Sequence, residues 1–401
     1  MNYYITKNDS ATGKKVVLDD MILTKDYPTT AGSKMLEGYM SLFNAEVVER
    51  LTENGYAIDG KAKVGELAID LLGETSYFGA TVNEAGKLTG ASAEIVKNTD
   101  CVASIGLDAN GTPRRAAALN GLVCIKPTYG TVSRFGTISV ACSGEVVSVT
   151  AKKVADCKAV LNVIAGHDDK DGTSHSEEKC ALVKEGAEYT SIKRVAVAKS
   201  ITNSADSAVI AKVEAAKAVF EANGVEVSYI DDSVISLAKM AWNILMSAEL
   251  CNNVSRYDGV KYGYRTKDYK TIDELYTNSR TEAFGSLLKN VILFGSETLS
   301  TDNYKRMYDK ALRVRRVIVE EFEKIFGEFD AVLLPACAKD GYIAEDTKIN
   351  KYISYDENLY TAPATITGLP AITLGGVQLI GRFFSENALF DAAKFFEGDG
   401  K

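Results

Sequence analysis

The stretch that decides the fold covers residues 106–136 and has the sequence GLDANGTPRRAAALNGLVCIKPTYGTVSRFG. Within it, Asn110 and Gly111 precede a threonine, which is followed by proline, two arginines and three alanines. Threonine favours the N-cap of a helix, and proline is well tolerated in the first turn. We therefore predict that a helix begins at Thr112 and that the Thr112 hydroxyl accepts a backbone N–H as its N-cap.

The overall composition is that of a globular protein. The chain has 401 residues, of which 46% are hydrophobic and 25% charged, enough to bury one large core or two ordinary ones. The net charge of -8 argues against direct binding to nucleic acid, which needs concentrated Lys and Arg. The seven cysteines are scattered, which favours reduced thiols in a cytoplasmic protein. No apolar run approaches the roughly 18 residues of a membrane helix, and the N-terminus lacks a signal-peptide core.

Strands alternate with helices along the chain. The sequence predicts a buried strand at residues 193–198, a helix at 206–222 from its apolar spacing, and a further strand at 225–230. Further segments are predicted to be helical at residues 35–54 and over most of 233–326, and to be extended at residues 330–335. This β-α-β order is typical of an α/β fold with a largely parallel sheet covered by helices.

The motif CIKPTYG at residues 124–130, followed by Val-Ser-Arg at 132–134, resembles the amidase-signature family. Other strings are similar to the A subunits of bacterial tRNA-dependent amidotransferases within that family, at residues 255–265, 280–285 and 313–315, and residues 363–372 and 378–381 resemble the last core segments of the family. The resemblance implies the α/β fold of that family, a large mixed, mostly parallel β-sheet sandwiched between layers of α-helices. It covers nearly the whole chain, so we expect residues 1–401 to form a single domain.

Two expected departures from the family concern length. Family members carry a helical segment before the strand that bears their catalytic lysine, whereas here that strand begins close to the first residue. They also have a hairpin between the positions of Thr373 and Gly376, which here is reduced to almost nothing.

The resemblance implies a Ser–cis-Ser–Lys triad, and all three matching positions are substituted. The lysine position corresponds to Asp19, the cis-serine position to Leu88, and the nucleophile position to Thr112. Leucine has no proton to relay, so we predict an ordinary trans peptide bond before Leu88. An aspartate does not reproduce a neutral amine beside a serine relay, and Thr112 alone keeps a hydroxyl.

The remaining site positions also follow from the resemblance. The loop that supplies backbone N–H groups to the oxyanion corresponds to Ala109, Asn110 and Gly111, whose shape is expected to survive because asparagine tolerates positive φ. The arginine that holds a glutamine carboxylate corresponds to Val291, and the aspartate that reads its amino group corresponds to Asn358. Together with Tyr360, these side chains are expected to line or fill the former substrate pocket.

We expect no metal and no cofactor. The only two histidines, His167 and His175, lie in a polar segment with acidic residues, where a solvated loop is favoured over a metal site.

These substitutions leave two main hypotheses. The first is a pseudoenzyme, an amidase fold without catalysis that serves in binding or assembly, with other amidotransferase-type subunits or a second copy as partner. The second is an altered amidase in which Thr112 attacks a small neutral amide, with Asp19 or Asp20 as base. A third, weaker hypothesis keeps the chain as a working component of an amidotransferase complex. Membranes and nucleic acid are not expected to be direct partners.

Overall fold

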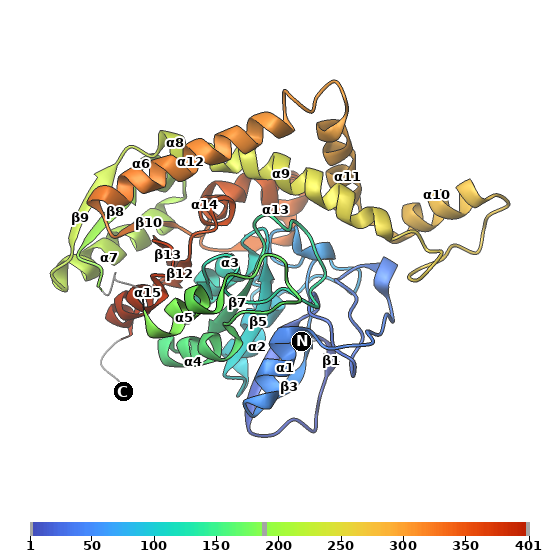
Figure 1. Cartoon of the computed structure of the whole chain (residues 1–401), viewed down its shortest axis with the longest axis horizontal. Coiled ribbons are helices and arrows are strands. Elements are labelled where there is room, and N and C mark those ends of the chain that lie inside the picture. Colours follow the sequence, from blue (N-terminus) through green and yellow to red (C-terminus); the bar gives the residue numbers. More distant parts are fainter. Residues whose placement is uncertain (1–2, 187–190, 398–401) are drawn as a thin grey trace.

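A single large sheet forms the centre of the computed structural model, which describes residues 3–186 and 191–397 (Figure 1). The sheet has 11 strands in the order β1-β3-β2-β5-β7-β6-β12-β13-β10-β8-β9, and β4 pairs with β11 in a separate ribbon. The strands are β1 (Tyr4–Lys7), β2 (Lys14–Asp19), β3 (Tyr56–Ala62), β4 (Lys87–Leu88), β5 (Ala103–Asp108), β6 (Val123–Lys126), β7 (Val146–Ala151), β8 (Arg194–Ala198), β9 (Glu226–Ile230), β10 (Ala331–Pro335), β11 (Tyr342–Ile343), β12 (Ala371–Leu374) and β13 (Val377–Gly381).

The sheet is mixed, as predicted, but its centre is antiparallel. Parallel pairs occur on the two flanks, in β3–β2–β5 and in β10–β8–β9. From β5 through β7, β6, β12 and β13 to β10, every pairing is antiparallel. The expected predominance of parallel pairs therefore holds only on the flanks, because the central strands are joined by non-local pairings that a β-α-β pattern does not reveal.

The helices are α1 (Glu46–Glu53), α2 (Ala91–Asn98), α3 (Thr112–Asn120), α4 (Val154–Ile164), α5 (Glu177–Glu185), α6 (Lys199–Asn203), α7 (Ser207–Ala222), α8 (Ser233–Ser236), α9 (Ala238–Asn253), α10 (Ile272–Ala283), α11 (Ser286–Leu299), α12 (Tyr308–Glu328), α13 (Ala344–Ile349), α14 (Ile353–Thr367) and α15 (Glu386–Ala393). Four short 3-10 turns are η1 (Lys34–Leu36), η2 (Glu66–Ala68), η3 (Val254–Arg256) and η4 (Lys394–Phe396). The predicted strand–helix–strand unit of residues 193–230 is confirmed as β8, α7 and β9.

The predicted helix over residues 35–54 is wrong in its first half. Only η1 and α1 are helical, and the connection between them turns at Gly38, whose φ is +72°. The Ser41 hydroxyl donates to the Phe43 carbonyl at 2.7 Å, and the Thr29 N–H donates to the Tyr39 carbonyl at 2.9 Å. These bonds satisfy the backbone without a helix, as short polar side chains commonly do.

Helices cover both faces of the sheet. Alternate residues of β8 belong to different cores: Ala196 to the core that includes residues of α9, α11 and α12, and Val195 to the core that includes residues of α1, α4 and α15. Figure 1 shows α9 and α12 along the upper side of the strands, and α4 and α5 below them. The expected sandwich of one sheet between two helical layers is confirmed.

The β12–β13 hairpin is short, as predicted. Leu374 pairs with Val377, and the two glycines between them have φ of +54° and +84°. Two successive left-handed residues form the tight turn whose twist matches that of a hairpin, and glycine adopts them without steric cost.

One helical segment is long and apolar enough to cross a membrane, Ser233–Arg256, with a mean hydropathy of 1.3. It contains α8, α9 and η3. More than half of its most apolar window is buried, and Trp242, Leu245 and Met246 are fully inaccessible. This composition is that of a core helix, because α9 packs between the sheet and the helices α11, α12 and α14.

Candidate functional site

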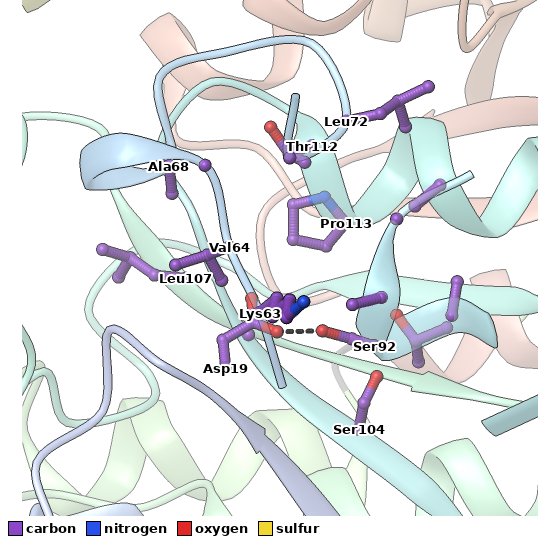
Figure 2. A pocket seen from close by; sticks show the side chains of 18 residues that line it. Asp19, Lys63, Val64, Ala68, Leu72, Ser92, Ser104, Leu107, Thr112 and Pro113 are labelled. Carbon is purple, nitrogen blue, oxygen red and sulfur yellow. Dashed lines mark hydrogen bonds between the residues drawn. The ribbon is translucent and has the colours of Figure 1, made fainter. Parts of the chain in front are cut away.

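A small cavity lies where β2 ends and the helices α2 and α3 begin (Figure 2). Asp19, Lys63, Ser92, Ser104 and Thr112 contribute polar groups to its wall. Its volume is about 40 Å³, compared with about 10–15 Å³ for one water molecule on the same measure. The space holds a few atoms and is far below the roughly 300–1,000 Å³ of ordinary ligand pockets.

The carboxyl group of Asp19 lies over the backbone of β5. A Cβ on Gly106 would come within 2.5 Å of Asp19 Oδ2, so only glycine leaves room for this side chain. The Ser92 hydroxyl donates to Asp19 Oδ1 from the first turn of α2. Burial raises the pKa of Asp19 to about 7, and the Ser92 hydrogen bond counteracts part of this rise. Where a lysine would provide an amine, this chain has a buried carboxyl group.

The neighbouring Asp20 belongs to a different cluster. It accepts the Thr30 hydroxyl and backbone N–H, and Lys61 Nζ lies 3.4 Å from Asp20 Oδ1. Both charged side chains are fully buried. Asp20 does not line the cavity and faces an ion-pair partner, so it is not placed to take a proton from Thr112.

Leu88 lies in the ribbon that β4 makes with β11, where it pairs with Tyr342. Its side chain is fully buried in a third apolar cluster with Ile95, Ala116 and Tyr342, outside the cavity wall. The described residues contain no cis peptide bond, so the predicted trans bond before Leu88 is confirmed. Leu88 is therefore part of the hydrophobic core.

Thr112 is not the N-cap, and that prediction is wrong. The helix α3 starts with Thr112 itself, and Gly111, at φ +79°, is the cap, since the Arg115 N–H donates to the Gly111 carbonyl at 3.0 Å. The Thr112 hydroxyl donates instead to the backbone carbonyl of Asp70 at 3.2 Å. A carbonyl acceptor leaves the hydroxyl proton in place, whereas a nucleophile needs a base at that position.

The Asp70 carbonyl belongs to a segment that closes the site from above, residues 65–75, which we call the cover segment. Asn110 Nδ2 donates to the Ile69 carbonyl at 2.8 Å, and Arg115 Nη1 donates to the Leu71 carbonyl at 2.8 Å. Ala68, Leu72 and Gly73 line the cavity, as Figure 2 shows for Ala68 and Leu72. The backbone of the cover segment therefore occupies the hydrogen-bonding groups around Thr112.

The cover segment is held by its own acidic side chains. Glu66 accepts the Ser33 hydroxyl at 2.6 Å and the Gly285 N–H at 2.8 Å, and burial raises its pKa to about 7. Asp70 accepts the Gly73 and Thr75 N–H groups at 3.1 and 2.8 Å. Glu74 accepts the Leu71 and Leu72 N–H groups, and burial together with the charge of Asp70 raises its pKa to about 8. These bonds fix an otherwise irregular turn.

Backbone strain lies in the same segment. Leu67 and Ala68 have φ of +54° and +51°, which costs about 1–2 kcal/mol for each residue with a side chain. Two consecutive residues persist in this conformation only because the surrounding bonds fix it.

The predicted oxyanion loop is buried and bonded. The Gly111 N–H donates to Asp108 Oδ1 at 3.2 Å, and the Asn110 carbonyl accepts Arg115 Nη2 at 3.1 Å. The left-handed residue is Gly111 rather than Asn110, and a Cβ there would meet Thr361 at 2.3 Å. Ala109 is fully inaccessible. The loop keeps a sharp turn, but the Gly111 N–H already has an acceptor.

The structure does not bring the predicted substrate-pocket residues to this cavity. Val291 is fully buried in α11. Asn358 donates to Asn243 Oδ1 at 2.6 Å, and the Tyr360 hydroxyl lies 3.0 Å from that of Ser204. None of the three lines the cavity that contains Asp19 and Thr112. Val291 and Tyr360 belong to the same apolar core.

Sequence reasoning assigned no role to three features of the site: Ser92, Lys63 and the cover segment. Asp19 and Ser92 lie 73 residues apart, and Thr112 lies 42 residues from Asp70. No local spacing signals such contacts. In the sequence, the only indication of Ser92 as a site residue was its place four residues after Leu88.

The two histidines bond to their own loop. His167 Nδ1 lies 2.7 Å from the His175 carbonyl, and its Nε2 lies 3.0 Å from Asp169. Within residues 3–186 and 191–397, no group of three or more His, Cys, Asp or Glu side chains is arranged to hold a metal.

Comparison with known proteins agrees with this architecture. The Amidase family profile matches residues 11–390. The A subunit of glutamyl-tRNA(Gln) amidotransferase from Caldanaerobacter subterraneus subsp. tengcongensis is 36% identical, over 96% of this chain and 82% of its own length. The protein of the same name from Latilactobacillus sakei is 35% identical, over 98% of this chain and 84% of its own length.

Solved structures show the same fold. The crystal structure of the glutamyl-tRNA(Gln) amidotransferase A subunit from Thermotoga maritima is similar with a TM-score of 0.81 and 28% identity, covering 99% of this chain and 87% of that one. The Kluyveromyces lactis urea amidolyase is similar in fold, with a TM-score of 0.79 and 22% identity, over 95% of this chain and 22% of that one. A profile match along almost the whole sequence, with relatives above one-third identity, establishes the family: this chain is a member of the amidase family.

Proposed function

We propose that this protein is a catalytically degenerate amidase, with the fold of an amidotransferase A subunit but a role in binding or assembly. The observation that carries the proposal is the bond from the Thr112 hydroxyl to the Asp70 carbonyl, at 3.2 Å. This bond directs the Thr112 hydroxyl, at the position of the family nucleophile, away from Asp19. Asp19 is the titratable group at the position of the family lysine. With Leu88 in the core, no side chain connects the two.

The magnitude of the expected loss supports the proposal. Residues of a catalytic triad act as a unit, so their loss costs on the order of 10⁶ in rate, and about 10³–10⁴ over water remains from binding and the oxyanion hole. Here the Gly111 N–H is also bonded to Asp108, which removes part of that remainder.

Its proposed partners are other subunits of an amidotransferase type or a second copy of this chain. Two similar proteins carry the name of a subunit, which supports a role in a complex. All seven cysteines are free thiols, which supports a reducing, cytoplasmic compartment.

The test is ammonia release by the purified full chain from glutamine, asparagine and acetamide. We expect no turnover above that of buffer, and the same result for Thr112→Ala. Amide hydrolysis that disappears in Thr112→Ala while the variant keeps its melting temperature would sink the proposal.

The second candidate, an altered amidase with Thr112 as nucleophile, is favoured by one observation. Asp19 and Thr112 line the same cavity, and the pKa of Asp19 near 7 suits a general base. A serine-hydrolase reagent that labels Thr112 would support it, whereas labelling elsewhere or nowhere supports the degenerate amidase.

Restoring the three triad residues alone is expected to give no amidase. The triple variant Asp19→Lys, Leu88→Ser and Thr112→Ser leaves the cover segment and the cavity of about 40 Å³ in place. We expect glutamine turnover at the level of buffer in the same ammonia assay, and turnover above the unmodified chain would contradict the importance of the cover segment.

A further inference from the structure

Ser92 is the second residue of α2, directly after a sharp turn. The short strand β4 ends at Leu88, the chain turns sharply at Gly90 with φ +80°, and α2 begins at Ala91. A Cβ on Gly90 would lie 2.8 Å from the Ala116 Cβ, so the turn is also tightly packed against α3. This packing fixes the start of α2, and with it Ser92, at the cavity wall.

The Ser92 hydroxyl, unlike that of Thr112, faces a base. It donates to Asp19 Oδ1, and the Asp19 side chain is held over Gly106. Figure 2 shows this bond crossing the cavity beside Lys63. A hydroxyl whose proton already points at a carboxylate is arranged for deprotonation during attack.

The backbone N–H groups at the start of α2, at Ser92 and its two neighbours, have no helical acceptor. The first intrahelical bond of α2 is from the Glu94 N–H to the Gly90 carbonyl, at 3.1 Å. The N–H groups of the three preceding residues, 91–93, therefore precede the helical ladder, and these residues line the cavity. Such groups carry partial positive charge at a helix start and stabilise an oxyanion.

A second, independent feature indicates that the cavity accommodates a polar group. Ser104 is only 3% exposed and lines the cavity, and no group in the described part of the chain bonds to its hydroxyl. Figure 2 shows Ser104 beneath the Asp19–Ser92 bond. Lys63, half-buried at the wall, is likewise without an ion-pair partner among residues 3–186 and 191–397. A buried hydroxyl without a hydrogen-bond partner is costly unless a ligand uses it.

We propose that Ser92 is an acylation site for small activated acyl groups of acetyl or carbamoyl size. Ser92 Oγ forms a bond to the carbonyl carbon and its proton passes to Asp19. The helix-start N–H groups and Lys63 offset the charge on the carbonyl oxygen. The tetrahedral intermediate then expels the leaving group, which takes the proton from Asp19, and Ser92 remains as an ester. The volume of about 40 Å³ sets the size limit.

This inference goes beyond the proposed function and does not depend on it. It requires one acyl transfer to Ser92 and no turnover of an amide. If Ser92 does not react, the proposal of a degenerate triad still stands. If amide turnover occurs through Thr112, the proposed acylation of Ser92 is not affected.

The experiment treats the full chain with p-nitrophenyl acetate and follows p-nitrophenol release together with peptide mass mapping. We expect a burst of one equivalent and an acetyl group on the peptide with Ser92. The burst rate is expected to rise as the pH increases through about 7, because Asp19 must be ionised to accept the proton. p-Nitrophenyl decanoate is expected to give no burst, since its chain exceeds the cavity.

Three variants identify the residues responsible. Ser92→Ala and Asp19→Asn are expected to slow the burst on the order of 100-fold or more, the usual contribution of a general base. The surface control Ser10→Ala is expected to leave it within about twofold, because Ser10 lies outside the cavity. Melting temperatures show whether each variant folds. Peptide mapping of the unsubstituted chain tests acetylation of Ser92 even where a variant does not fold. Acetylation confined to Lys63, Thr112 or surface lysines, or an unchanged burst in Ser92→Ala, would overturn the proposal.

Discussion

Replacing Arg114 by alanine is expected to lower the free energy of unfolding by about 3–5 kcal/mol, the cost of leaving a buried charge without its partner. Arg114 is fully inaccessible and bonds Asp108 through two nitrogens, at 2.7 and 3.0 Å. It also donates to Thr361, Thr365 and Gln378, so a single side chain joins α3 to β5, α14 and β13.

The same substitution is expected to loosen the site. Asp108 accepts the Gly111 N–H, and the Arg114 guanidinium keeps the pKa of Asp108 below its usual value despite burial. Urea unfolding measures the loss, and Arg316→Ala is the matched control because its bond to Glu320 lies on the surface. Equal effects of the two substitutions would contradict a structural role for the buried Arg114–Asp108 pair.

Raising the pH from about 5 to 7 is expected to destabilise the protein. Burial raises the pKa of Asp19 and of Glu66 to about 7, from ordinary values of 3.8 and 4.5. Between these limits the folded chain binds protons that an unfolded chain has released, so stability is greatest below the ordinary pKa and falls as pH rises through the folded pKa. Each group contributes roughly 2 kcal/mol across this window, at about 1.4 kcal/mol per pH unit.

Two other buried groups, Glu74 and Lys126, affect the choice of pH range. Glu74 acts in the same direction up to about pH 8, whereas Lys126, whose pKa burial lowers to about 7, adds stability as the pH rises above 7. Urea midpoints between pH 5 and 7 therefore include the contribution of Glu74 and leave out most of that of Lys126, and the variants separate Asp19 and Glu66 from Glu74. Asp19→Asn and Glu66→Gln are each expected to flatten the dependence, and Glu345→Gln, on the surface, to leave it unchanged. A midpoint that rises with pH over this range would show that both carboxyl groups are ionised in the folded protein.

Local pattern was sufficient for the outer parts of the fold. The strands β8 and β10 and the helix α7 start within one residue of the predicted boundaries, since apolar spacing alone fixes them. The antiparallel centre was beyond prediction by pattern, because β5 pairs with β7, β6 with β12, and β10 with β13 across long sequence separations. Residues 37–45 were misassigned as helix because Gly38 and a bond between Thr29 and Tyr39 decide their path.

The candidate site was likewise predictable only in part. Resemblance to the family identified Asp19 and Thr112, and the structure places both on one cavity wall. The partners that decide what these residues can do, Ser92 and the carbonyl of Asp70, come from segments distant in sequence. A single sequence therefore suggests which positions to compare with the family but not which distant groups contact them.

Trapping an acyl intermediate tests the loss of the nucleophile most directly. The chain is incubated with glutamine, and separately with acetamide, then quenched in acid, digested and mapped by mass spectrometry. Because the Thr112 hydroxyl donates to a carbonyl and has no base, we expect an unmodified residue 112 in every digest. A glutamyl or acetyl ester on Thr112, formed during steady ammonia release, would contradict the degenerate triad.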